Sequence, residues 1–269
     1  MPDRKKIYGY DEELWFEVLR QQQNTGERDL GTIVSALESY GIGVGKEIVD
    51  LGCGTGRISN RLAKVGYFVT GIDLSLKCVE EASRMAQELG VSDKTRYLVG
   101  DYRNVEIFSG KKYDAALCIL APAWNSTEEM SSALTKLSGI VRRGGILLLR
   151  ESVKERFLVS MAVAPSTQNW FRFSGDLLSL HRWDYDQSKS KVRAVKEFYR
   201  KDEKDASLRL LTKIEQEYTL RTIAEYINAF QGAGWEVCNV LADSVDLLNL
   251  AKYNDPWWAF SALFVARFR

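Results

Sequence analysis

The chain has 269 residues, 45% of them hydrophobic, and its 37 basic side chains nearly balance its 36 acidic ones. This hydrophobic content is enough for a buried core and excludes a disordered chain. The near-zero net charge excludes a general electrostatic attraction to nucleic acid or to an anionic membrane surface. No stretch approaches the roughly eighteen apolar residues of a membrane span, and residues 1–6 lack the apolar segment of a secretion signal. We therefore expect a cytoplasmic protein with no membrane partner.

Cysteine and histidine are sparse in this sequence. The four cysteines lie far apart, without a Cys-X2-Cys pair, and the chain has one histidine. This pattern predicts no metal site, and it favours buried free thiols in a reducing compartment.

Apolar periodicity predicts helices at 11–20 and 28–40, followed by an alternation of strands and helices. The predicted strands are 47–51, 68–73, 95–99, 113–120 and 145–150, and the predicted helices among them are 57–65, 76–89 and 127–141. The last of these helices opens with Ser126 three residues before Glu129, the pattern of a capping box. Strands that alternate with helices indicate a parallel sheet, which binds its ligand at the carboxyl ends of the strands.

The pattern changes after Arg150. Three segments rich in β-forming residues, at 176–185, 191–200 and 207–218, predict a small antiparallel sheet. A helix capped by Thr219 and two final strands, at 235–242 and 259–268, then resume the core. The predicted domains are an N-terminal helical cap at 1–45, a core at 46–150 and 219–269, and an inserted antiparallel β subdomain for substrate or oligomer contacts at 151–218.

The motif with the clearest chemical meaning is DLGCGTG at 50–56, directly after the first predicted strand. Its three alternate glycines let the backbone approach a flat polar ligand, because glycine has no Cβ and tolerates positive φ. Free N–H groups at the start of the following helix are expected to point at the same ligand, which we expect to be a nucleoside. Two related nucleotide-binding motifs are absent from the sequence. Arg57 replaces the last glycine of the dinucleotide fingerprint, and Glu47 replaces the Ser or Thr that ends a phosphate loop.

The DLGCGTG sequence resembles the first motif of the class I S-adenosylmethionine-dependent methyltransferases. The resemblance is strongest over residues 47–150. It implies a Rossmann-like, seven-stranded sheet with flanking helices, and S-adenosylmethionine as the cofactor. It also implies that Gly52, Cys53 and Gly54 pass beneath the cofactor, while Asp50 supports the loop and the methionine end.

Residues at the ends of the following strands complete the cofactor site that the resemblance implies. Asp73 ends the second strand, where a carboxylate can accept hydrogen bonds from both ribose hydroxyls. The resemblance assigns Asp101 to the adenine amino group, Tyr102 to the face of the ring, and Leu120 to the methionine part. The full set of cofactor-binding candidates is Asp50, Gly52, Cys53, Gly54, Gly56, Asp73, Leu74, Asp101, Tyr102 and Leu120.

The predicted insertion narrows the expected reaction. A β insertion after the fifth strand, then Tyr-Thr-Leu at 218–220 and a helix, resembles small-molecule N-methyltransferases such as those that act on amino sugars. Methyl transfer from a sulfonium is an in-line displacement, so the protein mainly aligns the acceptor and excludes water. A general base is needed only where the acceptor arrives protonated. We expect transfer to a nitrogen or oxygen of a small molecule.

The segment after the fourth strand bears on the acceptor. Methyltransferases of adenine or amide nitrogens carry an Asn or Asp, two prolines and an aromatic residue here. This chain has Ala121 and Ala123 instead of the first residue and the second proline, which argues against adenine in DNA. Trp124 is a candidate wall of the substrate pocket, with a packed core tryptophan as the alternative.

Candidate catalytic residues leave weaker traces. His181 is a candidate general base because its ordinary pKa lies near neutrality, and a structural role is the alternative. In the N-terminal region, Tyr10 is a candidate catalytic residue and Trp15 a candidate substrate contact, with helix packing as the alternative.

Three other functions stay open at this point. An RNA methyltransferase would use the locally basic insertion, although the overall charge makes nucleic acid an unlikely partner. A non-catalytic module could hold the same cofactor as a regulator or partner subunit. Nicotinamide-dependent redox chemistry is disfavoured by Arg57.

For the assembly of the protein, a homodimer is a candidate.

Overall fold

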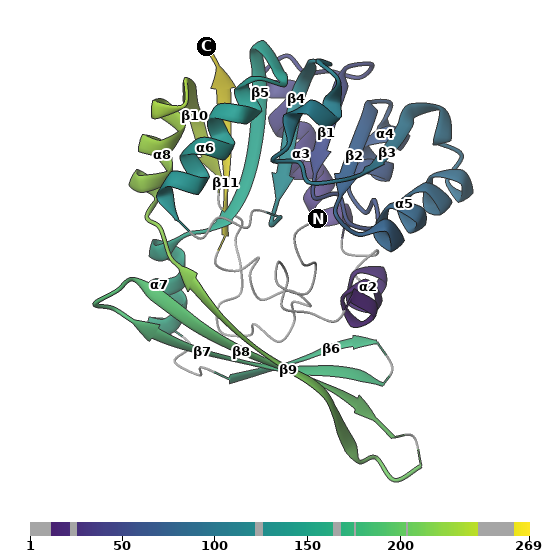
Figure 1. Ribbon diagram of the computed structural model, residues 1–269, viewed down its shortest axis with the longest axis vertical. Coiled ribbons are helices and arrows are strands. Elements are labelled where there is room, and N and C mark those ends of the chain that lie inside the picture. Colours follow the sequence, from purple (N-terminus) through teal and green to yellow (C-terminus); the bar gives the residue numbers. More distant parts are fainter. Residues whose placement is uncertain are drawn as a thin grey trace. The chain divides into compact units, whose positions relative to one another are not determined.

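The computed structural model describes residues 12–21, 26–121, 126–163, 168–174, 176–202, 204–241 and 261–269. The chain folds into two compact units, each with its own sheet (Figure 1). The core unit comprises Trp15–Glu151, Ile227–Leu241 and Leu263–Arg269, and the second unit includes Ser152–Tyr226.

The core unit is built on a seven-stranded sheet with the order β10-β11-β5-β4-β1-β2-β3 (Figure 1). Its strands are β1 (Glu47–Leu51), β2 (Phe68–Asp73), β3 (Thr95–Val99), β4 (Tyr113–Ile119), β5 (Val141–Ser152), β10 (Trp235–Leu241) and β11 (Ser261–Phe268). Strand β1 pairs in parallel with β2 and β4, whereas β10 and β11 are antiparallel. The predicted Rossmann-like fold class is therefore confirmed.

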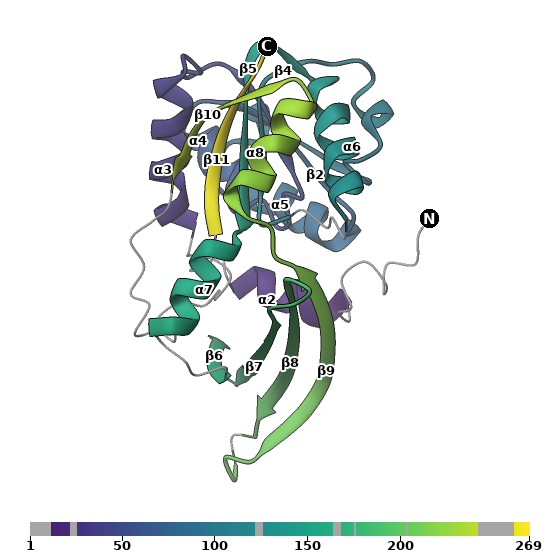
Figure 2. The same cartoon turned by 90° about the vertical axis from the view of Figure 1, so that its left-hand side faces the viewer.

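Helices cover both faces of this sheet (Figure 2). They are α3 (Gly26–Ser39), α4 (Ser59–Val65), α5 (Leu76–Glu88), α6 (Thr127–Ser138) and α8 (Ile223–Gly232). A further helix is α2 (Glu12–Gln21), and short 3-10 turns lie at Ser92–Lys94 and Val105–Phe108. On one face, α3, α4 and α5 share a hydrophobic cluster with the strands through Ile33, Leu62 and Ala86. On β11, Phe264 lies between Leu263 and Val265 of that cluster, so its side chain points to the opposite face of the sheet. There its ring packs against Phe230 of α8, with ring centroids 5.8 Å apart.

Helix boundaries follow from local hydrogen bonds. Ser126 accepts the Glu129 N–H at 3.2 Å, as its predicted cap of α6. The predicted cap Thr219 is wrong, because this residue ends a strand of the second unit. The capping box of α8 is instead formed by Thr222 and Glu225: the Glu225 carboxyl group accepts the Thr222 N–H at 2.7 Å, and the Thr222 hydroxyl accepts the Glu225 N–H at 3.2 Å.

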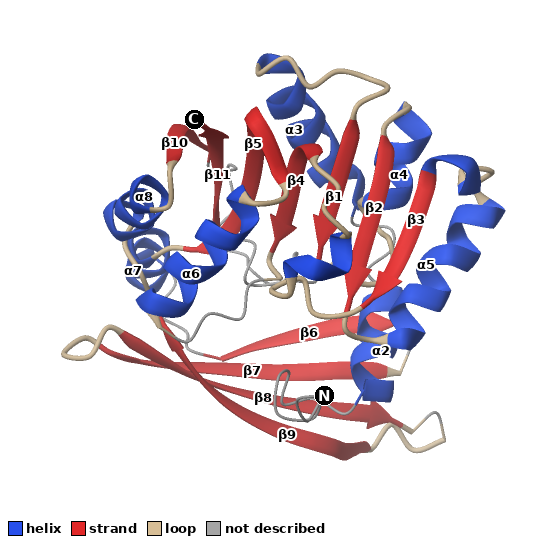
Figure 3. Ribbon diagram, turned by 45° about the horizontal axis from the view of Figure 1, so that its top comes forward, coloured by secondary structure: helices blue, strands red, loops and turns tan. Residues whose placement is uncertain are grey.

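The second unit contains a four-stranded antiparallel sheet in sequential order (Figure 3). Its elements are α7 (Lys154–Val163), β6 (Gln168–Ser174), β7 (Leu177–Asp186), β8 (Lys191–Lys201) and β9 (Leu208–Thr219). The three predicted strands correspond to β7, β8 and β9. The prediction missed β6 and α7.

A separate hydrophobic cluster stabilises the second unit. Trp183 of β7 and Val192 and Ala194 of β8 are buried there against Phe157 of α7. This contact gives α7 an apolar partner that belongs to strands distant in the sequence. No helix in the described ranges combines the length and the apolar character needed to cross a membrane.

Candidate functional site

The glycine loop, Gly52 to Gly56, connects the carboxyl end of β1 to the turn before α4. Its backbone folds onto β2, because the N–H groups of Gly52 and Cys53 both donate to the Ile72 carbonyl oxygen, at 2.8 and 3.0 Å. Gly52, Gly54 and Gly56 have φ angles of 75°, 53° and 74°. Residues with a side chain rarely adopt this region, so the backbone path accounts for the alternate glycines of the motif.

Two of these glycines are also required by packing. A Cβ on Gly52 would lie 2.4 Å from the Cβ of Ala121, just after β4. A Cβ on Gly56 would lie 2.9 Å from both the Cβ of Ala82 and the hydroxyl of Tyr97. The turn after Gly56 also delays α4, which begins at Ser59, two residues later than predicted.

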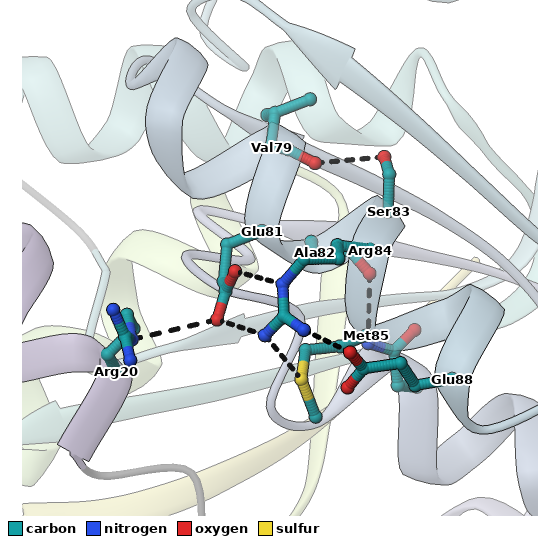
Figure 4. A network of polar contacts seen from close by, with 9 residues as sticks. Arg20, Val79, Glu81, Ala82, Ser83, Arg84, Met85 and Glu88 are labelled. Carbon is teal, nitrogen blue, oxygen red and sulfur yellow. Dashed lines mark hydrogen bonds and ion pairs between the residues drawn. The ribbon is translucent and has the colours of Figure 1, made fainter.

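Gly54 has more space than its neighbours, and helix α2 lies beside it. Among the described residues, the atom closest to a Cβ built on Gly54 is Cδ1 of Leu19, at 3.5 Å. Arg20 of the same helix lies 3.8 Å from the Glu81 carboxyl group of α5, which also accepts hydrogen bonds of 2.7 and 2.8 Å from Arg84 (Figure 4). These contacts hold α2 next to the open part of the glycine loop.

The Asp73 side chain links the end of β2 to the glycine loop. Its carboxyl oxygens accept the Gly54 N–H and the Ser75 N–H, each at 2.9 Å. Burial raises the pKa of Asp73, and the N–H groups of Ser75, Gly54 and Leu74 oppose this effect. Because a carboxylate has about four acceptor positions, Asp73 keeps acceptor capacity for a ligand after these contacts.

Asp50 is buried beneath the loop. It accepts a hydrogen bond of 2.5 Å from the hydroxyl of Ser59, the first residue of α4. Burial raises the pKa of Asp50 to about 6, although Ser59 and Arg57 lower it. Asp50 therefore joins the end of β1 to the start of α4. Sequence reasoning missed Ser59, whose hydroxyl could have been noted as a partner close behind the glycine motif.

Asp101 follows β3 and is engaged by its neighbour Arg103. The guanidinium group donates to both carboxyl oxygens at 2.6–3.0 Å, and the Arg103 N–H donates as well, at 2.9 Å. Partial burial raises the pKa of Asp101, but Arg103 outweighs it and the pKa is lowered. Sequence reasoning missed Arg103, and the Asp-X-Arg spacing was the available signal.

Tyr102 and Leu120 lie at the carboxyl ends of β3 and β4. Burial raises the pKa of the Tyr102 hydroxyl, and the electrostatic influence of Cys118 on β4 raises it further. Leu120 has a φ of 53°, a strained conformation for a leucine, and its N–H donates to the Arg150 carbonyl oxygen of β5 at 3.1 Å.

His181 belongs to the second unit, on β7. It is buried, and its Nε2 lies 3.0 Å from the hydroxyl of Ser179. The rings of Trp183 and Phe198 pack edge-on against the imidazole, with ring centroids 5.9 and 6.2 Å from its centroid. Burial and the nearby Lys196 lower its pKa well below the ordinary value, so the imidazole is neutral near pH 7.

The structure describes one of the three aromatic candidates. Trp15 lies on α2 and is partly buried. Tyr10 and Trp124 lie outside the described residues.

Comparison with known proteins relates this geometry to a family. Residues 48–145 match the family model of a methyltransferase domain. The magnesium-protoporphyrin O-methyltransferase of Synechocystis sp. is 32% identical over 122 residues, which are 45% of this chain and 51% of the relative. The ubiquinone biosynthesis O-methyltransferase of Rickettsia felis is 31% identical over 126 residues, 46% of this chain and 49% of the relative. The chain thus spans about half the length of these curated relatives.

A solved structure resembles the chain over most of its length. CalS10, an amino pentose methyltransferase from Micromonospora echinaspora involved in calicheamicin biosynthesis, has a TM-score of 0.69 and 21% identity, with 97% of this chain and 98% of that chain covered. That structure has S-adenosylmethionine bound. These matches agree with the predicted methyltransferase fold. Residues 48–145 form a methyltransferase domain, and the chain has the fold of the class I S-adenosylmethionine-dependent methyltransferases.

Proposed function

We propose that this chain is an S-adenosylmethionine-dependent methyltransferase that transfers the methyl group to a nitrogen or oxygen of a small molecule. The hydrogen bond between Gly54 and Asp73 carries the proposal, because it holds the glycine loop of a methyltransferase domain against the acid at the end of β2. The names of the relatives support a small acceptor, since they include two O-methyltransferases and an amino pentose methyltransferase.

The glycine loop fits the cofactor. The space at Gly54 suits a ligand that lies against the backbone, and Asp73 has acceptor capacity for the ribose hydroxyls. In this assignment Gly52, Cys53, Gly54 and Gly56 form the surface under the cofactor, Leu74 lies beside the ribose, and Asp50 supports the loop from below. The bound sulfonium supplies an activated methyl group, and the chain orients it and excludes water.

The adenine end is assigned to the residues after β3. Asp101 would accept a hydrogen bond from the adenine amino group, sharing its oxygens with Arg103, and Tyr102 would lie against the ring. Leu120 is assigned to the methionine part, since its strained conformation turns the chain sharply at the end of β4.

The acceptor is assigned to residues outside the glycine loop. His181 and Tyr10 are the proposed catalytic residues, and Trp15 and Trp124 the proposed substrate contacts. The His181 imidazole is uncharged near pH 7 and so has a nitrogen that can accept a proton, although its lowered pKa makes it a weaker base than an ordinary histidine. We assign the subdomain at 151–218 to substrate or oligomer contacts. The free cysteines support a cytoplasmic location. We also propose a homodimer, which sedimentation analysis of the molecular mass would test.

Calorimetric titration with S-adenosylmethionine and S-adenosylhomocysteine tests the proposed function. The wild-type protein should bind both. Asp73→Asn should bind each at least about tenfold more weakly, since a hydrogen bond to a charged group contributes about 1.5–3 kcal/mol. Glu80→Gln removes an exposed carboxyl group of α5 and is the matched control. Folded wild-type protein that binds neither compound would overturn the proposal.

A further inference from the structure

The carboxyl end of β5 brings Glu151 next to the end of β4. Ile119 pairs with Arg150 in the parallel register, and the Leu120 N–H donates to the Arg150 carbonyl oxygen at 3.1 Å. Glu151 is therefore placed beside Leu120, the residue assigned to the methionine part of the cofactor. All of these residues belong to the core unit.

Strand alternation places the Glu151 side chain on one face of the sheet. Leu149 pairs with Cys118, so the side chains of these two residues lie on the same face. Glu151 is two residues beyond Leu149 and lies on that face too. Consistent with this, the negative charge of Glu151 contributes to the raised pKa of both Cys118 and Tyr102. Unlike the fully buried Cys118, Glu151 is partly exposed and can meet a ligand.

Glu151 differs in charge from Cys118 and Tyr102, the two groups whose pKa it raises. The pKa of the Tyr102 hydroxyl and that of the Cys118 thiol are both raised, mainly by burial, so both groups stay protonated and neutral. Glu151 contributes the negative charge beside them. A carboxylate in a partly buried setting favours a cationic partner that also donates hydrogen bonds, as an ammonium group does.

We propose that Glu151 binds the amino group of the methyl acceptor, and that the acceptor is therefore an amine. This inference rests on the proposed function. The acceptor arrives as R–NH3⁺ and releases one proton to the Glu151 carboxylate. The nitrogen lone pair then forms a bond to the methyl carbon while the carbon–sulfur bond breaks, its electrons remaining on sulfur. The products are the methylated ammonium ion and S-adenosylhomocysteine.

An amine-bearing cofactor analogue tests this inference without knowledge of the acceptor. In sinefungin, a carbon that carries an amino group replaces the methylsulfonium centre, so its ammonium group lies where the methyl group is transferred. We would measure the Kd of sinefungin and of S-adenosylhomocysteine for wild type, Glu151→Gln and Glu80→Gln, after confirming by circular dichroism that each is folded. Wild type and Glu80→Gln should bind sinefungin about tenfold more tightly than S-adenosylhomocysteine, and Glu151→Gln should lose this preference.

The outcomes separate the two proposals. If wild type binds neither compound, the proposed function fails and this inference fails with it. If wild type binds both compounds and Glu151→Gln leaves their affinity ratio unchanged, the methyltransferase assignment stands and the role of Glu151 is wrong. A Glu151→Asp variant distinguishes loss of the carboxylate from a local change in packing. It keeps the negative charge and should therefore retain part of the preference for sinefungin.

Discussion

The backbone N–H of Gly54 donates to the carboxyl group of Asp73 at 2.9 Å, although 19 positions separate the two residues. The parallel pairing of β1 with β2 brings them together, because both residues lie at the carboxyl ends of these strands. The same carboxyl group accepts the Ser75 N–H. Asp73 is thus part of the loop structure before any ligand is considered, and its substitution tests both stability and binding.

We expect Gly52→Ala to lower the free energy of unfolding by about 3 kcal/mol, because overpacking and positive φ both oppose a side chain here. The new Cβ would lie 2.4 Å from the Cβ of Ala121. Urea denaturation measures the loss. The double variant Gly52→Ala/Ala121→Gly removes the colliding methyl group and should regain about half of it, relative to Ala121→Gly alone. A double variant with no regain would exclude the collision as the cause.

We expect Asp50 to make the protein less stable as the pH rises from 4 to 7. Its pKa is about 6 in the folded protein, above the ordinary 3.8. The unfolded chain therefore loses this proton at lower pH than the folded protein does. The stabilisation is complete below about pH 4 and is lost through pH 6, up to about 3 kcal/mol.

Asp50→Asn isolates this contribution. Asparagine stays neutral and can accept the same hydrogen bond from Ser59. The free energy of unfolding of Asp50→Asn, minus that of wild type, should increase from pH 4 to pH 7.5. A difference that is constant over this range would contradict the raised pKa.

His181 is predicted to act in the opposite direction. Its pKa is well below 6.5 in the folded protein, so the unfolded chain binds a proton more readily below about pH 6.5. The stability of wild type should therefore fall relative to that of His181→Gln as the pH decreases from 7.5 to 5, with a slope of up to about 1.4 kcal/mol per pH unit. Thermal unfolding at several pH values measures both proteins. Parallel curves would mean that His181 keeps an ordinary pKa.

Arg103 is expected to restrain the binding of adenine. Its guanidinium group donates to both oxygens of Asp101. Arg103→Ala should free an acceptor for the adenine amino group and tighten S-adenosylhomocysteine binding about threefold, as expected for a hydrogen bond with a net contribution of about 0.5–1.5 kcal/mol. In the Asp101→Asn background the same change should have little effect. Weaker binding by Arg103→Ala in the wild-type background would instead assign the arginine itself to the ligand.

The sequence predicted the elements whose signals are local. The strands at 47–51, 68–73 and 95–99 have the predicted bounds, because each is a short run closed by a turn or an acid. The start of α4 was predicted too early, since the turn at Gly56 depends on Ala82 and Tyr97. Helix α7 was missed because the contacts that stabilise it come from the distant strands β7 and β8.

The candidate site also contains residues that local sequence signals predict and residues that they do not. The glycines and the strand-end acid Asp73 could be named from the motif and the spacing of the strands. Ser59 was missed although it follows the glycine motif closely and contacts Asp50, nine residues before it. Glu151 could not be named, because the end of β4 becomes its neighbour only when β4 and β5 pair. The bidentate contact of Arg103 with Asp101 is local in the chain, but many arginines follow an acid without pairing to it, so the sequence alone does not select it.

Tyr97 has a consequence for the cost of binding. Its ring atoms occupy the position that a Cβ on Gly71 would need, its hydroxyl lies against Gly56, and this hydroxyl donates to Asn60 at 2.6 Å. A side chain from β3 thus acts as a wedge beneath the glycine loop. A loop that is preorganised in this way loses little conformational entropy when a ligand arrives. The affinity of the cofactor should therefore be set mainly by the contacts it makes, because little free energy is lost in ordering the loop.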